Sequence, residues 1–183
     1  GVPAIQLAKI MGAGRVITTC SPRHEALLRR LGADEVINYH VANWWEVLGE
    51  GSLGAVLDII PFSGNGRHAL KVLADGGTYV ELLQTGLDAG RDKGACEVWR
   101  FGDDIDTRYT CSSRARSSVR LVDWELHHFG PSDLDYLRSL VEAGKLVPIV
   151  DSVHTLEHTA EAFEASASQH STGKVVIKVS DVR

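Results

Sequence analysis

Residues that could hold a phosphate-bearing cofactor cluster near the start of the chain. Gly1 directly precedes an apolar helical stripe, and the spacing Gly1-x-x-Ala4 fits the last part of a dinucleotide-binding fingerprint. In such a loop the glycine lets the backbone approach a pyrophosphate, and the N–H groups of the next helix, which would begin here at Val2, hold the anion. A plain turn before a helix would give the same pattern, so the interpretation depends on the residues after the next strand.

The second part of a dinucleotide fingerprint lies about 20 residues further on, at the end of the next strand. The chain has Thr19-Cys20-Ser21 there, with no acidic residue to bind ribose hydroxyls, and Arg23 and His24 come directly afterwards. A hydroxyl and two potential cations suit a 2′-phosphate, so the residues favour NADP(H) over NAD(H). Ser21 could equally cap the helix that Pro22 begins, and both roles remain open.

Other motifs in the chain compete with this interpretation. The pattern Gly64-x-Gly66-x-x-Ala69 also follows an apolar strand and opens a helix, with Glu81 as a possible ribose ligand. Gly173-Lys174 lacks the upstream glycine and the following Ser or Thr of a P-loop. His154 and His158 have ligand-like spacing, but no third ligand is apparent, so we predict no metal site.

The composition excludes several classes of protein. The 183 residues include 19 Lys and Arg and 24 Asp and Glu, and a net charge of −5 argues against nucleic acid or an anionic membrane as partner. No apolar run approaches the length of a membrane span, which needs about 20 residues. Three cysteines without a C-x-x-C pair favour an intracellular location over secretion.

Helices alternate with short β-rich runs along most of the chain, which predicts βαβ units and a mainly parallel sheet. The strands are expected at 15–20, 35–39, 55–60, 78–83, 120–127, 147–153 and 174–179. The run 55–60 is apolar throughout, as in a strand buried on both faces. The stretch 84–117 has no sustained period and is either a functional flap or structure without a readable pattern.

The apolar positions between these strands predict amphipathic helices. Their buried faces are expected to be Ala4, Leu7, Ala8 and Met11; Ala26, Leu27, Leu28 and Leu31; Leu134, Leu137 and Val141; and Leu156, Ala160, Phe163 and Ala167. Gly32 and Gly144 are expected to end the second and third of these helices. The pair Trp44-Trp45 is expected to pack in the core or at its rim rather than to form a stacking platform.

The segments AIQLAK, LGADEVINY and GKVVIKV resemble the cofactor-binding half of the medium-chain dehydrogenase/reductases. The most similar branch is that of the zinc-free quinone oxidoreductases, which includes the mitochondrial reticulon-interacting oxidoreductases. The resemblance implies an α/β fold with a doubly wound, parallel Rossmann-type sheet. It also implies that Gly1 is the last fingerprint glycine and that Gly64–Ala69 is a loop after the fourth strand.

In that fold the first strand is central, because the strand order is 3-2-1-4-5-6. By the resemblance, this strand would lie upstream of Gly1, so we expect the chain to be a fragment that folds poorly alone. The resemblance further implies an NADP-binding, Rossmann-like domain over residues 1–145. Residues 146–183 would return toward a GroES-like catalytic domain that also lies upstream.

The resemblance implies cofactor-binding roles for ten residues. Gly1 and Val2 would lie at the pyrophosphate, Ser21, Arg23 and His24 at the 2′-phosphate, Tyr39 at the adenosine, and Ile59, Leu82, Leu83 and Gln84 toward the nicotinamide. Ile59 departs from the family pattern after Asp58, and Gln169-His170 replaces an arginine that often precedes the final Gly-Lys. No catalytic residue is identified, because the resemblance places the substrate-side groups upstream.

The expected function is that of an NADPH-dependent reductase of quinones or α,β-unsaturated carbonyl compounds. The departures at Ile59 and Gln169-His170 leave a second hypothesis open: a non-catalytic subunit that serves assembly or nucleotide sensing in a larger complex. The strand Arg120–His127 would be the outermost of the sheet, which predicts a homodimer through this edge, or a heteromeric contact there. Among organelles, the resemblance favours the mitochondrion.

Overall fold

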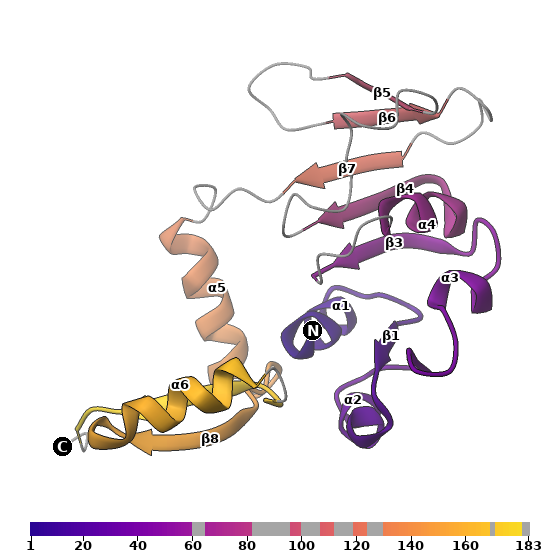
Figure 1. The fold of residues 1–183 in the computed structure, drawn as a ribbon. Coiled ribbons are helices and arrows are strands. Elements are labelled where there is room, and N and C mark those ends of the chain that lie inside the picture. The colour runs from indigo at the N-terminus through magenta and orange to yellow at the C-terminus, as the bar shows by residue number, and fades with distance from the viewer. Residues whose placement is uncertain are drawn as a thin grey trace. The chain divides into compact units, whose positions relative to one another are not determined.

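A computed structural model of the chain (Figure 1) has two compact units, Gly1–His40 with Phe129–Arg183 and Val41–His128. The structure describes residues 1–59, 65–81, 96–99, 107–111, 119–123, 130–168 and 171–180. These units do not coincide with the predicted boundary at residue 145, which stays a prediction. In the described part of the chain, no helix is both long and apolar enough to cross a membrane.

The first unit begins with alternating helices and parallel strands. Its elements are α1 (Val2–Ile10), β1 (Ile17–Cys20), the 3-10 turn η1 (Pro22–His24), α2 (Glu25–Arg30) and β2 (Glu35–Asn38). The two strands are parallel, with Cys20 opposite Asn38. Pro3 lies in the first turn of α1, where its missing N–H costs no hydrogen bond. The core of this part consists of Ile5, Val16, Cys20, Leu28 and Ala33.

The buried face of α1 differs from the predicted stripe. Ile5 and Gln6 are the buried residues of the helix, whereas Met11 is 79% exposed because α1 ends at Ile10. Gln6 can be buried although it is polar, because both ends of its side-chain amide are hydrogen-bonded. Nε2 donates to the carbonyl of Val147 at 3.0 Å, and Oε1 accepts from the N–H of Val147 at 2.8 Å. This polar pair ties α1 to a segment 141 residues away.

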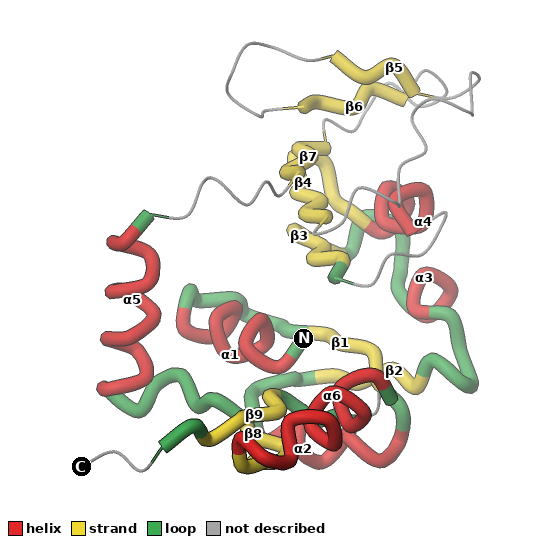
Figure 2. Tube along the Cα trace, turned by 60° about the vertical axis from the view of Figure 1, so that its left-hand side comes forward, coloured by secondary structure: helices red, strands yellow, loops and turns green. Residues whose placement is uncertain are grey.

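The C-terminal part of the first unit is a helix followed by a βαβ arrangement. Its elements are α5 (Pro131–Glu142), β8 (Val150–Thr155), η3 (Leu156–His158), α6 (Thr159–Ala167) and β9 (Lys174–Lys178). Strands β8 and β9 are parallel, and α6 packs on both of them (Figure 2). The predicted strand at 147–153 begins later than expected, because both backbone polar groups of Val147 are bound by Gln6.

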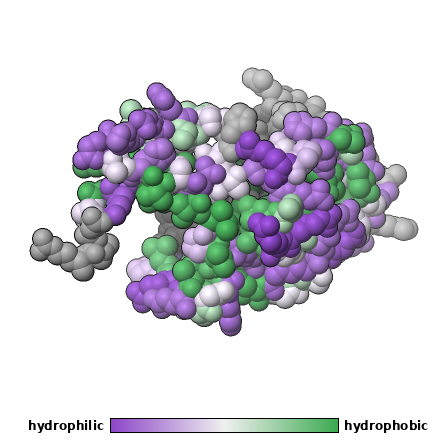
Figure 3. Space-filling model, turned by 90° about the horizontal axis from the view of Figure 1, so that it is seen from below, coloured by the Kyte–Doolittle hydropathy of each residue, from purple (hydrophilic) through white to green (hydrophobic). Residues whose placement is uncertain are grey.

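The predicted apolar face of the last helix is not its packed face. Leu156 and Phe163 are 53% and 67% exposed, whereas Ala162 is buried. Small side chains allow α6 to approach the two strands closely, so the larger apolar side chains face outward. Apolar side chains, drawn in green, are visible at the surface between polar ones in Figure 3.

The second unit contains a five-stranded sheet in the order β3-β4-β7-β6-β5 (Figure 1). Its elements are α3 (Trp44–Val47), β3 (Leu53–Asp58), α4 (Asn65–Val72), β4 (Leu73–Glu81), β5 (Cys96–Trp99), β6 (Thr107–Cys111) and β7 (Val119–Asp123). Strands β3, β4 and β7 are parallel, whereas β6 is antiparallel to β7 and β5. The core consists of Ala69, Leu73 and Tyr79, against which Trp44 and Leu53 pack.

The stretch 84–117 was expected to be either a functional flap or structure without a readable pattern, and it includes the strands β5 and β6. Two other expectations about this sheet were wrong. Strand β7 is not outermost: it lies between β4 and β6, and the outer position in the described sheet belongs to β5. Strand β3 is not buried on both faces, since Leu57 is 47% exposed. Among the strands described, β3 pairs with β4 alone.

Candidate functional site

The amino end of α1 has the features of an anion-binding helix terminus. Gly1 is the N-cap residue, no side chain caps the helix, and the Gly1 carbonyl accepts the N–H of Ile5 at 3.3 Å. The positive charge of Lys174 acts at this end of α1 and adds to the potential of the helix dipole.

The carboxyl ends of β1 and β2 bring Ser21 and Tyr39 to one edge. Because Cys20 and Asn38 are paired in the parallel register, Ser21 and Tyr39 each directly follow a paired strand end. Tyr39 is 55% exposed, and its ring lies against that of His40 with centroids 4.4 Å apart. Ser21 is the N-cap residue of η1, but its side chain makes no capping hydrogen bond. The roles of Ser21 at the 2′-phosphate and of Tyr39 at the adenosine stay predictions.

The turn after β1 brings Arg23 and His24 into contact. Nε of Arg23 donates a hydrogen bond to Nε2 of His24 at 2.7 Å. Nδ1 of His24 lies 3.2 Å from Oγ1 of Thr172, a residue 148 positions further along the chain. Because Nε2 accepts from Arg23, the imidazole proton is on Nδ1 and is donated to the Thr172 hydroxyl.

The environment of His24 makes its imidazole neutral. Burial is the main cause that lowers its pKa, and the charge of Arg23 lowers it further, while the Asp151 carboxylate acts in the opposite direction. A histidine whose pKa lies below its ordinary value is mostly uncharged at neutral pH. The sequence suggested His24 as a potential cation, and the structure corrects this: Arg23 supplies the positive charge of the turn.

The segment around Thr172 is held in place by three contacts that were not predicted from the sequence. The N–H of Thr172 donates to Oδ1 of Asp151 at 2.9 Å, and the N–H of Lys174 donates to the carbonyl of Ile149 at 2.9 Å. Gly173 has φ +105°, and a Cβ there would lie 2.2 Å from the Ile149 carbonyl oxygen. The signal in the sequence was Gly173-Lys174, which was weighed as a P-loop and which also begins the segment GKVVIKV.

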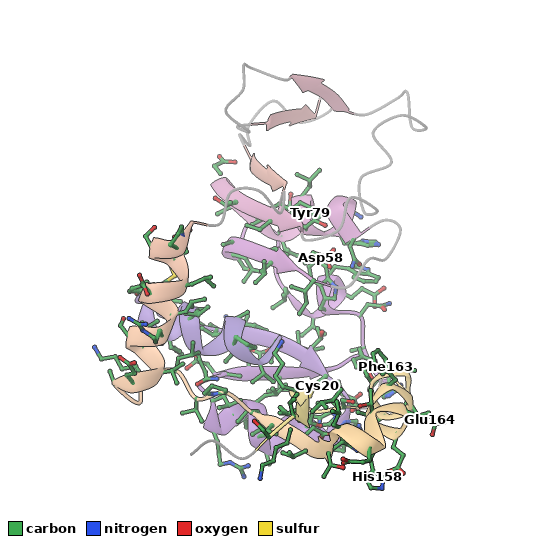
Figure 4. The ribbon with its side chains drawn as sticks, turned by 90° about the vertical axis from the view of Figure 1, so that its left-hand side faces the viewer. Cys20, Asp58, Tyr79, His158, Phe163 and Glu164 are labelled. Atoms are coloured by element: carbon green, nitrogen blue, oxygen red, sulfur yellow. The ribbon has the colours of Figure 1, made fainter. Side chains whose placement is uncertain are left out.

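The residues predicted at the nicotinamide end belong to the second unit. Ile59 directly follows β3 and is half-buried. Next to it, the carboxylate of Asp58 accepts a hydrogen bond of 2.9 Å from the hydroxyl of Tyr79, which is 2% exposed (Figure 4). Leu82, Leu83 and Gln84 lie outside the described residues, so their predicted roles stay predictions.

An aromatic cluster in this unit includes the predicted pair Trp44-Trp45 and also His68, which was not predicted to take part. The rings of Trp45 and His68 stack with centroids 3.7 Å apart and planes at 8°, and Trp44 meets Trp45 edge-on. Burial lowers the pKa of His68, so its ring is neutral at this apolar contact between α3 and α4. The tryptophans pack as expected. In the described ranges, there is no group of three or more His, Cys, Asp or Glu residues that could hold a metal ion.

Comparisons with known proteins agree with this architecture. Residues 31–177 match the model of the family described as zinc-binding dehydrogenase. The chain is 30% identical over 180 residues to the mitochondrial NAD(P)H oxidoreductase RTN4IP1 of Drosophila melanogaster, covering 98% of this chain and 43% of the relative. It is 40% identical over 91 residues to the trans-enoyl reductase TOXD of Cochliobolus carbonum, covering 48% of this chain and 30% of that protein.

Among solved structures, the quinone oxidoreductase of Coxiella burnetii is similar with a TM-score of 0.71 and 29% identity, covering 97% of this chain and 49% of that one. The predicted Rossmann-type α/β fold is thereby confirmed. The chain spans about half the length of the relatives that it matches along its whole length. It belongs to the zinc-binding dehydrogenase family of the medium-chain dehydrogenase/reductases.

Proposed function

We propose that this chain is the NADPH-binding half of an oxidoreductase that reduces quinones or α,β-unsaturated carbonyl compounds. The observation that carries the proposal is the turn after β1, where Arg23 supplies a cation and where Thr19-Cys20-Ser21 contains no acid for ribose hydroxyls. The relatives support the reaction class, because they include an NAD(P)H oxidoreductase, a quinone oxidoreductase and a trans-enoyl reductase.

The described residues fit a nicotinamide dinucleotide. The uncapped amino end of α1, with the potential of Lys174, would hold the pyrophosphate, and Ser21 and Arg23 would hold the 2′-phosphate. Tyr39 would cover the adenosine side. When bound, the cofactor supplies the hydride, while this chain binds and orients it. The described residues do not offer a metal ligand set, so zinc enters no step of the proposal.

A second candidate is a non-catalytic subunit that retains the fold for assembly or nucleotide sensing. It is favoured by Ile59, a half-buried apolar side chain directly after β3, at the place where the sequence predicted a contact to the nicotinamide ribose. Such a subunit would bind the cofactor without transferring hydride.

Titration of the full-length protein separates the two candidates. NADPH and NADH binding is measured by quenching of tryptophan fluorescence, and oxidation of NADPH is followed with a benzoquinone and an enone as acceptors. We expect tighter binding of NADPH than of NADH, and turnover with at least one acceptor. Tight NADPH binding without turnover on any acceptor supports the second candidate, and equal affinity for both cofactors contradicts the NADPH assignment.

The proposal also covers the oligomeric state of the protein and its location in the cell. We propose a homodimer, or a heteromeric complex, that forms at the outer edge of the sheet; β5 holds this position among the described strands. Because the Drosophila relative is named as mitochondrial, we also propose an intracellular, mitochondrial location. Sedimentation of the full-length protein and cell fractionation test these points. A monomer, or a protein absent from the mitochondrial fraction, contradicts them.

A further inference from the structure

We propose that Thr172 is a positioning residue of the 2′-phosphate subsite, which orients Arg23 through His24 and thereby strengthens the preference for NADPH. The inference rests on the proposed NADPH function, and it adds a residue from the C-terminal part of the chain to a turn that lies 148 positions earlier. The contact between Thr172 and His24 lies within one compact unit of the chain.

Thr172 is itself held in place by its neighbours. Asp151, on β8, accepts the backbone N–H of Thr172 at 2.9 Å. The next residue, Gly173, adopts a φ of +105° and passes so close to the Ile149 carbonyl that a side chain would not fit. The backbone of Thr172 is therefore held in place, and with it the position of the hydroxyl that contacts the turn after β1.

The imidazole of His24 is oriented by this hydroxyl. Oγ1 of Thr172 lies 3.2 Å from Nδ1 of His24 and can accept the proton of this nitrogen. With the proton on Nδ1, Nε2 presents its lone pair to Nε of Arg23 at 2.7 Å. Without the hydroxyl as acceptor, the Nδ1–H group would lose its partner, and the ring would no longer be held at this angle toward Arg23.

The guanidinium of Arg23 is oriented in turn by the imidazole. A guanidinium is planar and carries its donors in a rigid fork, so a hydrogen bond at Nε fixes the plane in which the two terminal nitrogens lie. Bidentate recognition of a phosphate requires that plane to be set in advance. NADH has no 2′-phosphate, so an effect that acts through Arg23 should appear with NADPH and not with NADH.

The test uses the full-length protein with Thr172→Val, which keeps the shape of the side chain but removes the hydroxyl, and Thr172→Ser, which keeps the hydroxyl. Dissociation constants are measured for NADPH, NADH and 2′,5′-ADP. We expect Thr172→Val to raise the values for NADPH and 2′,5′-ADP about fivefold to tenfold, as the loss of one hydrogen bond would. The value for NADH should stay unchanged, and Thr172→Ser should restore near-normal NADPH binding.

A second measurement needs no cofactor. The ¹⁵N NMR shifts of the His24 ring report its tautomer and the hydrogen bond at Nδ1. We expect the Nδ1–H tautomer in both proteins, because Nε of Arg23 can only donate, and a changed Nδ1 shift in Thr172→Val. The variant His24→Phe, which removes the link from the other side, should show the same selective loss of NADPH affinity. Adding Thr172→Val to His24→Phe should then cause no further loss.

Three results would overturn the inference: an equal loss of NADPH and NADH affinity, an unchanged NADPH affinity in Thr172→Val, or an unchanged Nδ1 shift of His24 in that variant. If Thr172→Val does not fold, His24→Phe and the rescue by Thr172→Ser decide in its place. Failure of the proposed function gives a different pattern, because the unmodified protein would then not distinguish NADPH from NADH. In that case Thr172 has no role in cofactor specificity, even if the NMR shifts show its hydrogen bond to His24.

Discussion

At the scale of single residues, Asp34 joins α1 to the start of β1. Its carboxylate accepts hydrogen bonds from Nζ of Lys9 and from the backbone N–H of Val16, both at 2.6 Å. The hydrogen bond from Lys9 is the largest cause that lowers the pKa of Asp34, followed by the one from Val16. The stabilisation is therefore complete above the ordinary pKa and is lost as the pH falls through the lower pKa of the folded state.

We expect Asp34→Asn to lower the free energy of unfolding at neutral pH. The loss relative to the unmodified protein should shrink on acidification, because protonation of Asp34 removes the same charge. Urea unfolding of both full-length proteins at about pH 7 and about pH 3 measures this difference. A difference that is equal at the two pH values would show that the charge of Asp34 contributes nothing to stability.

Tyr39 permits a test of the adenosine contact. Because its side chain is 55% exposed, Tyr39→Ala should leave the melting temperature of the full-length protein nearly unchanged and raise the dissociation constant of NADPH severalfold. Tyr39→Phe separates ring from hydroxyl: it retains binding if the ring stacks and loses it if the hydroxyl donates. A lower melting temperature with normal NADPH binding would instead assign Tyr39 a packing role.

At the scale of elements, Gln6 links α1 to the segment before β8. Gln6→Leu should lower the free energy of unfolding by about 1–3 kcal/mol, because two part-buried hydrogen bonds between the buried Gln6 side chain and the backbone of Val147 are lost. Met11→Ala, at the exposed end of α1, is the matched control and should have little effect. Denaturant unfolding of the full-length variants measures both. Equal effects of the two substitutions would contradict a specific role of Gln6.

The approach of β9 to the segment before β8 depends on Gly173. Gly173→Ala should destabilise the protein strongly, because its Cβ would meet the Ile149 carbonyl oxygen at 2.2 Å and φ is +105°. Gly14→Ala is the matched control, since a Cβ there meets nothing within 4 Å. Thermal unfolding should show a marked fall in melting temperature for the first variant only. A similar melting temperature for both would show that the segment relaxes without cost.

At the scale of the whole molecule, η3 and α6 expose apolar side chains that an isolated chain would leave in water. Leu156 and Phe163 are 53% and 67% exposed, and the matched relatives are about twice as long as this chain. We propose that the remaining part of the full-length protein covers this face, as expected for residues that return toward a catalytic domain.

Phe163→Asp should therefore lower the melting temperature of the full-length protein by several degrees, since it would bury an unpaired charge. Glu164→Gln, at the neighbouring exposed position of α6, is the control and should leave it unchanged. Differential scanning calorimetry measures both variants. If Phe163→Asp and the unmodified protein have the same melting temperature, this face is exposed to water in the full-length protein and the proposal is wrong.

The types of most elements and the family of the chain could be predicted from the residues alone. Local backbone preferences depend on adjacent residues, so Pro3 at the start of α1 and Gly32, with a φ of +108°, after α2 were readable directly. The order of strand, turn and helix around Ser21 was readable as well, because these elements succeed one another without a break. The strands β5 and β6 were not, since no alternation of apolar residues marks them.

The partner that each side chain meets became known only with the three-dimensional fold. Gln6 is buried because its partner, Val147, lies 141 residues away, and the packed face of α6 is formed by small side chains rather than by its largest apolar ones. His24 is neutral, and bound to Thr172, because the fold partly buries it beside Arg23 and brings the C-terminal segment to it. Burial and the approach of distant segments set these properties, and neither is encoded in the residues that flank the site.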